Sequence, residues 1–280
     1  MGLNRFTALC LTGALVALAS VAASSEDRRD HQAAAVDGLN GKVSGFGNTS
    51  GFGRFYGVDG SVSLPLGHRF GFQLDGLVSQ LDTEALGNAV AYGAGAHVFW
   101  RDPDRGLLGL YGHYASTDLT ESANFRAIGL EAEAYLDRIT LTALIGVEDG
   151  RFVSSEIGEF DLGTNFFSSV FLIYYPIDNL GLSVGHRYLV ETHSVSVEAE
   201  WAVENGSSRN TSLYTSVSYD ESDDTTAKFG VRYYFGQKEK SLIRRHREDD
   251  PSQSTILWAL EQAIGDLDSI INQYREFHGT

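Results

Sequence analysis

Several polar residues of this 280-residue chain are of the types that carry nucleophilic or acid–base chemistry. In the segment ETHSVS, His193 precedes Ser194 and Ser196. A serine hydrolase needs a histidine within hydrogen-bonding reach of its serine. Adjacent residues of a strand point to opposite faces, and both serines have the opposite parity to His193. The segment is therefore interpreted as a polar strand start, and no catalytic residue is predicted.

Two pairs of glutamates two residues apart are the other candidates for chemistry. Glu131 and Glu133 form one pair, and Glu198 and Glu200 form the other. On a strand each pair shares one face, where two carboxylates could act as acid and base. Such pairs also line water-filled interiors beside cationic neighbours, and this second interpretation is favoured here.

Metal and cofactor sites are not indicated. The four histidines His97, His113, His186 and His193 lack the spacing of metal ligands. The segment GAGAHV (93–98) lacks the third glycine of a dinucleotide-binding loop. Cys10 is the only cysteine and lies in the expected leader, so disulfides and thiolate chemistry are excluded from the mature protein. A net charge of −16 argues against nucleic acid as a partner.

The elements that would position these residues are strands, because apolar residues alternate with polar or small ones. In AKFGVRYYFG (227–236), Phe229, Val231, Tyr233 and Phe235 share one face, and Lys228 and Arg232 lie on the other. Twelve such segments are predicted between turn signals, at 42–48, 54–64, 70–81, 89–101, 107–117, 125–136, 139–149, 165–175, 180–190, 193–203, 211–220 and 225–235. The parity of 165–175 and the register around 204–210 stay open, because the first is apolar on both faces and the second link is long for a tight turn.

The chain begins with an expected export signal. Residues 1–23 combine Arg5, an apolar run and the small residues SVAA (20–23). An N-terminal membrane anchor is the alternative, but the run is short and interrupted. An exported chain with aromatic residues near the ends of its apolar strand faces favours a membrane barrel over a soluble β-sandwich, which would also show alternation.

The alternating segments, the closing GVRYYFG (230–236) and the glycine-rich VDGSVSLPLGHRFGFQLDG (58–76) resemble the porin-like outer-membrane β-barrel proteins of Gram-negative bacteria. The resemblance covers roughly 42–236 and implies an all-β fold, a single antiparallel transmembrane barrel of about 12 strands. It also implies outer-membrane lipid and the barrel-assembly machinery as partners. Residues 24–41 are then a periplasmic N-terminal segment. Barrels of this kind usually end at the closing strand, whereas 44 residues follow it here.

Strand parity predicts which charged side chains line the lumen. The candidates are Asp59, Asp75, Glu131, Glu133, Glu148, Glu198, Glu200, Arg187, Lys228 and Arg232, with Lys42, His97 and His113 on the same face. Acids outnumber Lys and Arg, and a ring of acids favours cations. The sequence therefore predicts a passive, weakly cation-preferring channel for small solutes. The alternative is a closed structural barrel that anchors a periplasmic interaction helix, and an outer-membrane hydrolase is less favoured.

The tail, residues 237–280, is predicted to be a periplasmic charged linker followed by an amphipathic helix. Its apolar stripe repeats at three-and-four spacing, with Gly265 in its middle. The stripe residues are Leu257, Leu260, Ile264, Leu267, Ile271 and Tyr274. We expect the stripe to bury against the barrel, a second copy or a periplasmic partner.

The barrel interpretation makes a prediction that needs no structure. The exported protein should be recovered in the outer-membrane fraction, and its mobility in detergent gels should change on heating, because closed barrels resist detergent until they are boiled. Recovery of the protein in soluble form without detergent would overturn the barrel assignment.

Overall fold

A computed structural model of the chain describes residues 34–83, 87–118, 122–154, 158–206, 208–236, 239–251 and 255–278. The expected signal segment 1–23, and most of the segment 24–41, therefore lie outside the described residues.

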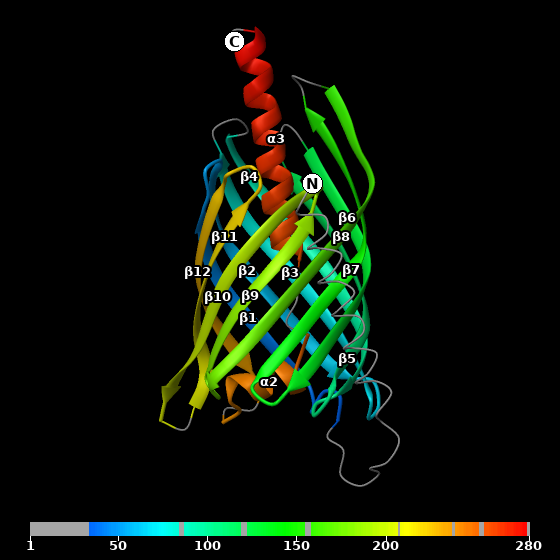
Figure 1. Cartoon of the computed structure of the whole chain (residues 1–280), viewed down its shortest axis with the longest axis vertical. Helices are drawn as coiled ribbons and strands as arrows, with labels where there is room; N and C mark the ends of the chain where they lie inside the picture. The colour runs from blue at the N-terminus through cyan, green and yellow to red at the C-terminus, as the bar shows by residue number, and fades with distance from the viewer. Residues whose placement is uncertain are drawn as a thin grey trace.

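Twelve antiparallel strands form one closed barrel in which each strand pairs with its sequence neighbours (Figure 1). The strands are β1 (Asn40–Thr49), β2 (Gly53–Pro65), β3 (Phe70–Thr83), β4 (Gly87–Asp102), β5 (Gly106–Asp118), β6 (Ser122–Leu136), β7 (Ile139–Ser154), β8 (Gly158–Ile177), β9 (Leu180–Leu189), β10 (Thr192–Asn205), β11 (Ser208–Asp220) and β12 (Thr225–Phe235). Closure comes from β1 pairing with β12, from Gly41 opposite Phe235 to Thr49 opposite Ala227. The predicted all-β barrel of twelve strands is confirmed.

Alternation in the sequence becomes an outer and an inner face in the structure. On β12, Phe229 is 58% exposed on the outside, whereas Tyr234 is 2% exposed on the inside. The same rule settles the parity of β8, where Phe167 and Phe171 are buried inside and Phe166 is exposed outside. The inward face of β8 is apolar because it contributes to a packed core in the lumen.

The links between strands are shorter than the sequence indicated. The stretch 150–164 was expected to be a long loop, but β7 reaches Ser154 and β8 begins at Gly158. Likewise β10 reaches Asn205 and β11 begins at Ser208. Polar residues at strand ends read as loop in sequence, yet a hairpin can extend into solvent with polar side chains on both faces.

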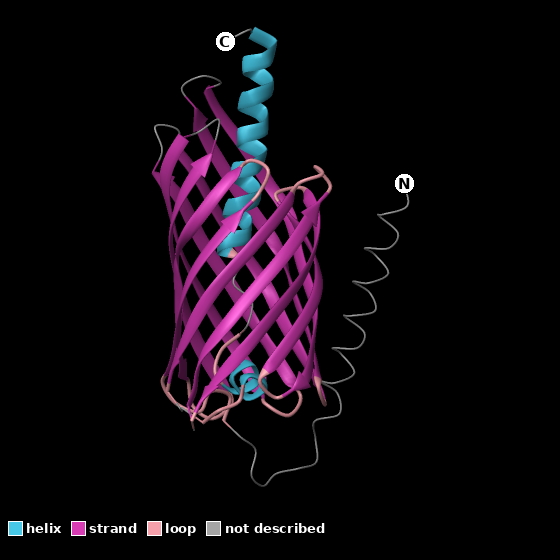
Figure 2. Ribbon diagram, turned by 90° about the vertical axis from the view of Figure 1, so that its left-hand side faces the viewer, coloured by secondary structure: helices cyan, strands magenta, loops and turns pink. Residues whose placement is uncertain are grey.

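Two helices follow the barrel, α2 (Leu242–Glu248) and α3 (Ile256–His278). Helix α2 lies at the mouth where β12 ends, and α3 runs up inside the barrel and projects from the opposite mouth (Figures 1 and 2). Neither helix is long and apolar enough to cross a membrane within the part of the chain that is described. The predicted C-terminal helix is confirmed. It was expected as an element separate from the barrel, whereas in the structure it begins inside the lumen, because the lumen itself offers the apolar surface that its stripe needs.

Small residues of the wall make room for α3. A Cβ atom on Gly93 would lie 2.4 Å from Cγ2 of Ile256, and one on Gly95 would lie 3.2 Å from its Cδ1. Gly265 plays the reverse part, since a Cβ there would lie 2.8 Å from the ring of Phe52. The glycine that weakens the isolated helix therefore permits its close approach to the wall.

Enlarging Gly93 should loosen α3 without breaking the barrel. We expect Gly93→Val to cost about 1–3 kcal/mol of docking free energy through overpacking. Cys10 is the only native cysteine, so thiol labelling at an introduced Ala263→Cys, a site that is 0% exposed, reports on docking. Labelling should become about tenfold faster or more.

Gly76→Val is the matched control, because a Cβ at Gly76 would meet no atom within 4 Å. Equal labelling rates in the two valine variants would contradict the assigned packing of α3 against β4.

Candidate functional site

The lumen is divided into an apolar part around α3 and a charged part next to α2. The apolar part is one continuous core in which the helix packs against inward residues of the wall. The wall contributes large side chains, among them Phe46, Phe55, Leu77, Leu81, Tyr111, Phe125, Leu144, Phe152 and Phe167. This core fills the part of the lumen that twelve strands leave too wide for their own side chains to close.

The predicted tail stripe supplies the helix side of this core. Leu257, Leu260, Ile264, Leu267 and Ile271 are all at most 9% exposed. The side chain of Tyr274 lies outside the described residues. The five described stripe residues are therefore covered by the barrel of their own chain.

Two ion pairs from the predicted lumen set cross the charged part. Arg187 of β9 donates to Glu198 Oε1 of β10 at 2.6 Å and to Ser196 Oγ at 3.0 Å. Arg232 of β12 donates to Glu200 Oε2 of β10 at 2.6 Å. Both pairs lie on neighbouring or next-neighbouring strands, so the sheet register brings them together.

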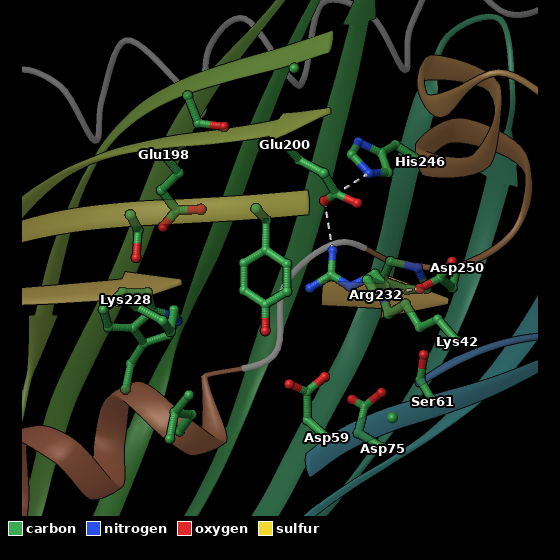
Figure 3. Close-up of a pocket in the computed structure, with 18 of the residues that line it drawn as sticks. Lys42, Asp59, Ser61, Asp75, Glu198, Glu200, Lys228, Arg232, His246 and Asp250 are labelled. Atoms are coloured by element: carbon green, nitrogen blue, oxygen red, sulfur yellow. Dashed lines mark hydrogen bonds and ion pairs between the residues drawn. The ribbon is translucent and has the colours of Figure 1, made fainter. Parts of the chain in front are cut away.

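Glu200 also connects the wall to the tail. Its carboxylate accepts hydrogen bonds from Ser212 Oγ at 2.5 Å and from Tyr234 Oη at 2.7 Å. The Nε2 atom of His246 in α2 lies 3.7 Å from the second oxygen. Four groups therefore converge on one buried carboxylate, as Figure 3 shows for Arg232 and His246.

A second network joins two predicted acids through a histidine. The ring of His97 lies 2.8 Å from Asp75 Oδ2 through Nε2 and 2.7 Å from Glu131 Oε2 through Nδ1. Gln73 donates to the other oxygen of Asp75 at 2.8 Å. The histidine is wholly buried, so the two carboxylates hold its ring between strands β3 and β6.

Two further predicted acids of the wall, Glu133 and Glu148, are also inward and bonded. Tyr135 Oη donates to Glu133 at 2.6 Å, and the backbone N–H of Val190 donates to Glu148 at 2.5 Å. Neither pair of adjacent glutamates faces an open site, because each member has its own partner. The acid–base interpretation of these pairs therefore has no geometry to support it.

The candidate site is a cavity of about 170 Å³ between α2 and α3 (Figure 3). Asp59 and Lys228 line it from β2 and β12, and Trp258 of α3 contributes to the same lining. Within the described part of the chain, the Asp59 carboxylate and Lys228 Nζ form no hydrogen bond or ion pair, and Lys228 Nζ lies 3.7 Å from the centroid of the Trp258 ring. These two opposite charges are the charged groups of the cavity lining without a direct ion pair, although they act on each other and Glu261 of α3 also acts on Lys228.

Helix α2 closes the mouth below the cavity. The backbone N–H of Ile243 donates to Asp178 O at 3.0 Å, and Arg247 Nε donates to Thr140 Oγ1 at 3.1 Å. Asp250, just after the helix, forms an ion pair with Lys42 of β1. These contacts join the tail to three separate regions of the barrel rim.

Lys240 is the most heavily paired residue of this mouth. Its buried ammonium contacts Asp249 and lies 2.5 Å from Asp37 and 3.3 Å from Glu248. Burial alone lowers the pKa of Lys240, but the carboxylates of Asp249 and Asp37 outweigh it, and the net shift is upward. The charge block at 237–250 was expected to be a linker, whereas it forms a set of tail-to-rim ion pairs.

Sequence reasoning missed several site residues, including His246, Asp250 and Trp258. Their signal was present as a dense run of mixed charge, RRHREDD (244–250), directly before an amphipathic helix. Such a run usually indicates a solvated linker. In the structure, charged residues of this run pair with inward charges of the barrel.

Among the described residues, His193 is not hydrogen-bonded to Ser194 or Ser196. His193 Nδ1 lies 3.1 Å from His186 Nε2, whereas Ser196 points inward to Arg187. Across the described ranges, no group of three or more His, Cys, Asp and Glu side chains could hold a metal ion.

Comparisons with known proteins add similarity at the level of fold. No protein-family model matches the chain, and no curated protein matches its sequence. Solved structures that are similar include the KdgM porin, at 12% identity and TM-score 0.49, covering 70% of this chain and 99% of that one. The translocator domain of the autotransporter NalP from Neisseria meningitidis is 14% identical, with TM-score 0.49 and 82% and 98% coverage. The COG4313 outer membrane channel from Pseudomonas putida F1 is 11% identical, with TM-score 0.49 and 75% and 100% coverage.

Removing the charge of Glu200 should cost far more stability than removing that of Glu198. The Glu200 side chain is 13% exposed and bonded to several groups, so we expect Glu200→Gln to cost about 3–5 kcal/mol. Glu198 is 31% exposed, so we expect Glu198→Gln to cost about 1 kcal/mol or less. Unfolding in urea, followed by the gel shift of the folded barrel, measures both. Equal midpoints would show that Glu200 is not the central anchor of this network.

Proposed function

We propose that this protein is an outer-membrane channel for small solutes whose lumen is held closed by its own C-terminal segment. The observation that carries the proposal is the combination of an apolar belt outside and a charged, partly hollow lumen inside. Large apolar side chains are exposed all around the outer face, with Val43, Tyr92, Leu110, Ile128 and Val197 as examples. A bilayer is the solvent that makes such a surface stable.

The charged lumen supports a channel because it retains features that a purely structural core does not need. The tail fills the lumen with contacts that are independent of strand pairing, so α3 can leave while the sheet stays closed. The wall that it would expose carries the acids and bases described above. A structural barrel would be expected to fill this space with apolar side chains, since buried ion pairs add little stability over well-packed apolar groups.

A closed barrel is the second candidate, and one observation favours it. The tail makes apolar contacts with many strands and ion pairs at the rim, so the structure is shut at both the α2 mouth and the α3 core. In that case the tail would be a permanent filling. The two candidates differ in whether release of α3 produces conductance.

Recording in planar bilayers separates the two candidates. We expect the full-length protein to conduct little, and the double variant Leu260→Asp with Leu267→Asp to give steady conductance, because charge on the stripe opposes its burial. Leu39→Asp is the matched control, since Leu39 is 72% exposed outside the core. A folded double variant that stays silent would favour the closed barrel.

The same recordings test ion preference. The seven acids of the predicted lumen set face five inward Lys and Arg, namely Lys42, Arg101, Arg187, Lys228 and Arg232, so the released lumen should prefer cations. Adding Glu198→Gln to the released variant should move the reversal potential toward anions, because Arg187 then loses its partner. An anion preference before that substitution would contradict the proposed selectivity.

A further inference from the structure

The cavity between α2 and α3 has the charge pattern of a binding site for a small zwitterion. It is lined by the acids Asp59, Asp75, Glu198, Glu200 and Asp250 and by the bases Lys42, Lys228, Arg232 and His246. Most of these charges already have a partner. Lys42 pairs with Asp250 and Arg232 with Glu200 within the lining, and Asp75 pairs with His97 and Glu198 with Arg187 outside it. What a ligand meets is therefore set by the charges that have no such partner.

Asp59 is the acid of the lining that the described residues leave unpaired. It stands on β2 opposite Ser44, which in turn stands opposite Arg232 of β12. Arg232 donates to Glu200 and to Ser44 Oγ and forms no ion pair with Asp59, although the two charges lie near enough to act on each other. An unpaired carboxylate at the edge of a cavity is a site for an ammonium group.

Lys228 is the corresponding base. Its Nζ lies over one face of the Trp258 ring, while the guanidinium of Arg187 lies 3.7 Å from the centroid of the same ring. No carboxylate of the described residues lies within ion-pair distance of Lys228, although Glu261, Glu198 and Asp59 act on its charge from farther away. The ammonium group of lysine has three N–H donors, and the Trp258 ring accepts no conventional hydrogen bond from them. A ligand carboxylate can therefore accept hydrogen bonds from Lys228.

We propose that this cavity binds a small zwitterionic solute, with its ammonium group at Asp59 and its carboxylate at Lys228. A cavity of about 150 Å³ holds a molecule the size of benzene, so the 170 Å³ here suits a short amino acid. A simple amine would leave Lys228 unused, and a simple carboxylate would meet a lining in which acids outnumber bases.

This inference names the solute class for the proposed channel, so it rests on that function for its role in transport. Binding itself is measured without conductance, and the two proposals therefore fail separately. A zwitterion that binds to a barrel that never conducts would keep the site and remove the channel.

Isothermal titration calorimetry on the full-length protein in detergent tests the site with glycine, β-alanine and 4-aminobutyrate as probes. At least one should bind saturably, and both its methyl ester and its N-acetyl form should bind tenfold more weakly or worse, since each lacks one charge. Saturable binding of ethylamine or acetate with equal affinity would overturn the zwitterion assignment. Absence of saturable binding by all three probes would overturn the site.

Variants locate the binding. Asp59→Asn and Lys228→Gln should each weaken it at least tenfold, whereas Asp104→Asn, the same change at an exposed turn residue, should leave it unchanged. The exchange Asp59→Lys with Lys228→Asp should restore part of the affinity, because a zwitterion can bind in the reverse direction. Folding of each variant is checked by its gel shift, and unchanged affinity in both folded single variants would place the ligand elsewhere.

Discussion

The pairing of β1 with β12 is the interaction on which the rest of the structure depends. It satisfies the last free row of backbone N–H and C=O groups, and a sheet in a bilayer has no other partner for them. Closure also creates an interior whose width is fixed by the number of strands. With twelve strands that interior is too wide for side chains of the wall to fill, yet narrower than the aqueous channel of a sixteen-stranded porin. The tail fills part of the space that closure of the barrel creates.

The lumen solves this problem differently along its length. Around α3 the wall offers aromatic and aliphatic side chains where the helix is apolar, and glycine or alanine where it must come close. Near α2 the wall offers charges, and the tail brings complementary ones. Trp258 lies at the boundary between the apolar and the charged part, with the charged groups of Arg187 and Lys228 each 3.7 Å from the centroid of its ring. A cavity persists there because neither mode of filling extends across the change from apolar to charged packing.

Most of the sheet could be predicted from the sequence, because a strand with one face toward lipid and one toward a wet interior alternates strictly. The prediction was ambiguous at β8, where the inward Phe167 and Phe171 are as apolar as the outward residues. Parity also placed the charged wall residues on the correct face without showing which would pair, since pairing depends on register between strands that local patterns do not specify.

The tail was harder for a related reason. The apolar stripe of the helix predicted that this face is buried, but it did not identify the surface that covers it. The inward Phe46, Phe55 and Leu77, together with Gly93 and Gly95, were the matching signal on the wall. They are informative only when read as a set contributed by strands far apart in the chain.

The covalent connection between β12 and α3 has a thermodynamic consequence. A tethered segment meets its site at an effective concentration on the order of millimolar for a short linker, and this value does not change with the amount of protein present. The fraction of molecules with α3 docked is thus independent of the expression level. A competitor in solution displaces the helix only when the ratio of its concentration to its dissociation constant exceeds the same ratio for the tethered helix. Cleavage of the chain after Gly236 would remove this advantage, because binding of the tail would then be bimolecular and would weaken on dilution.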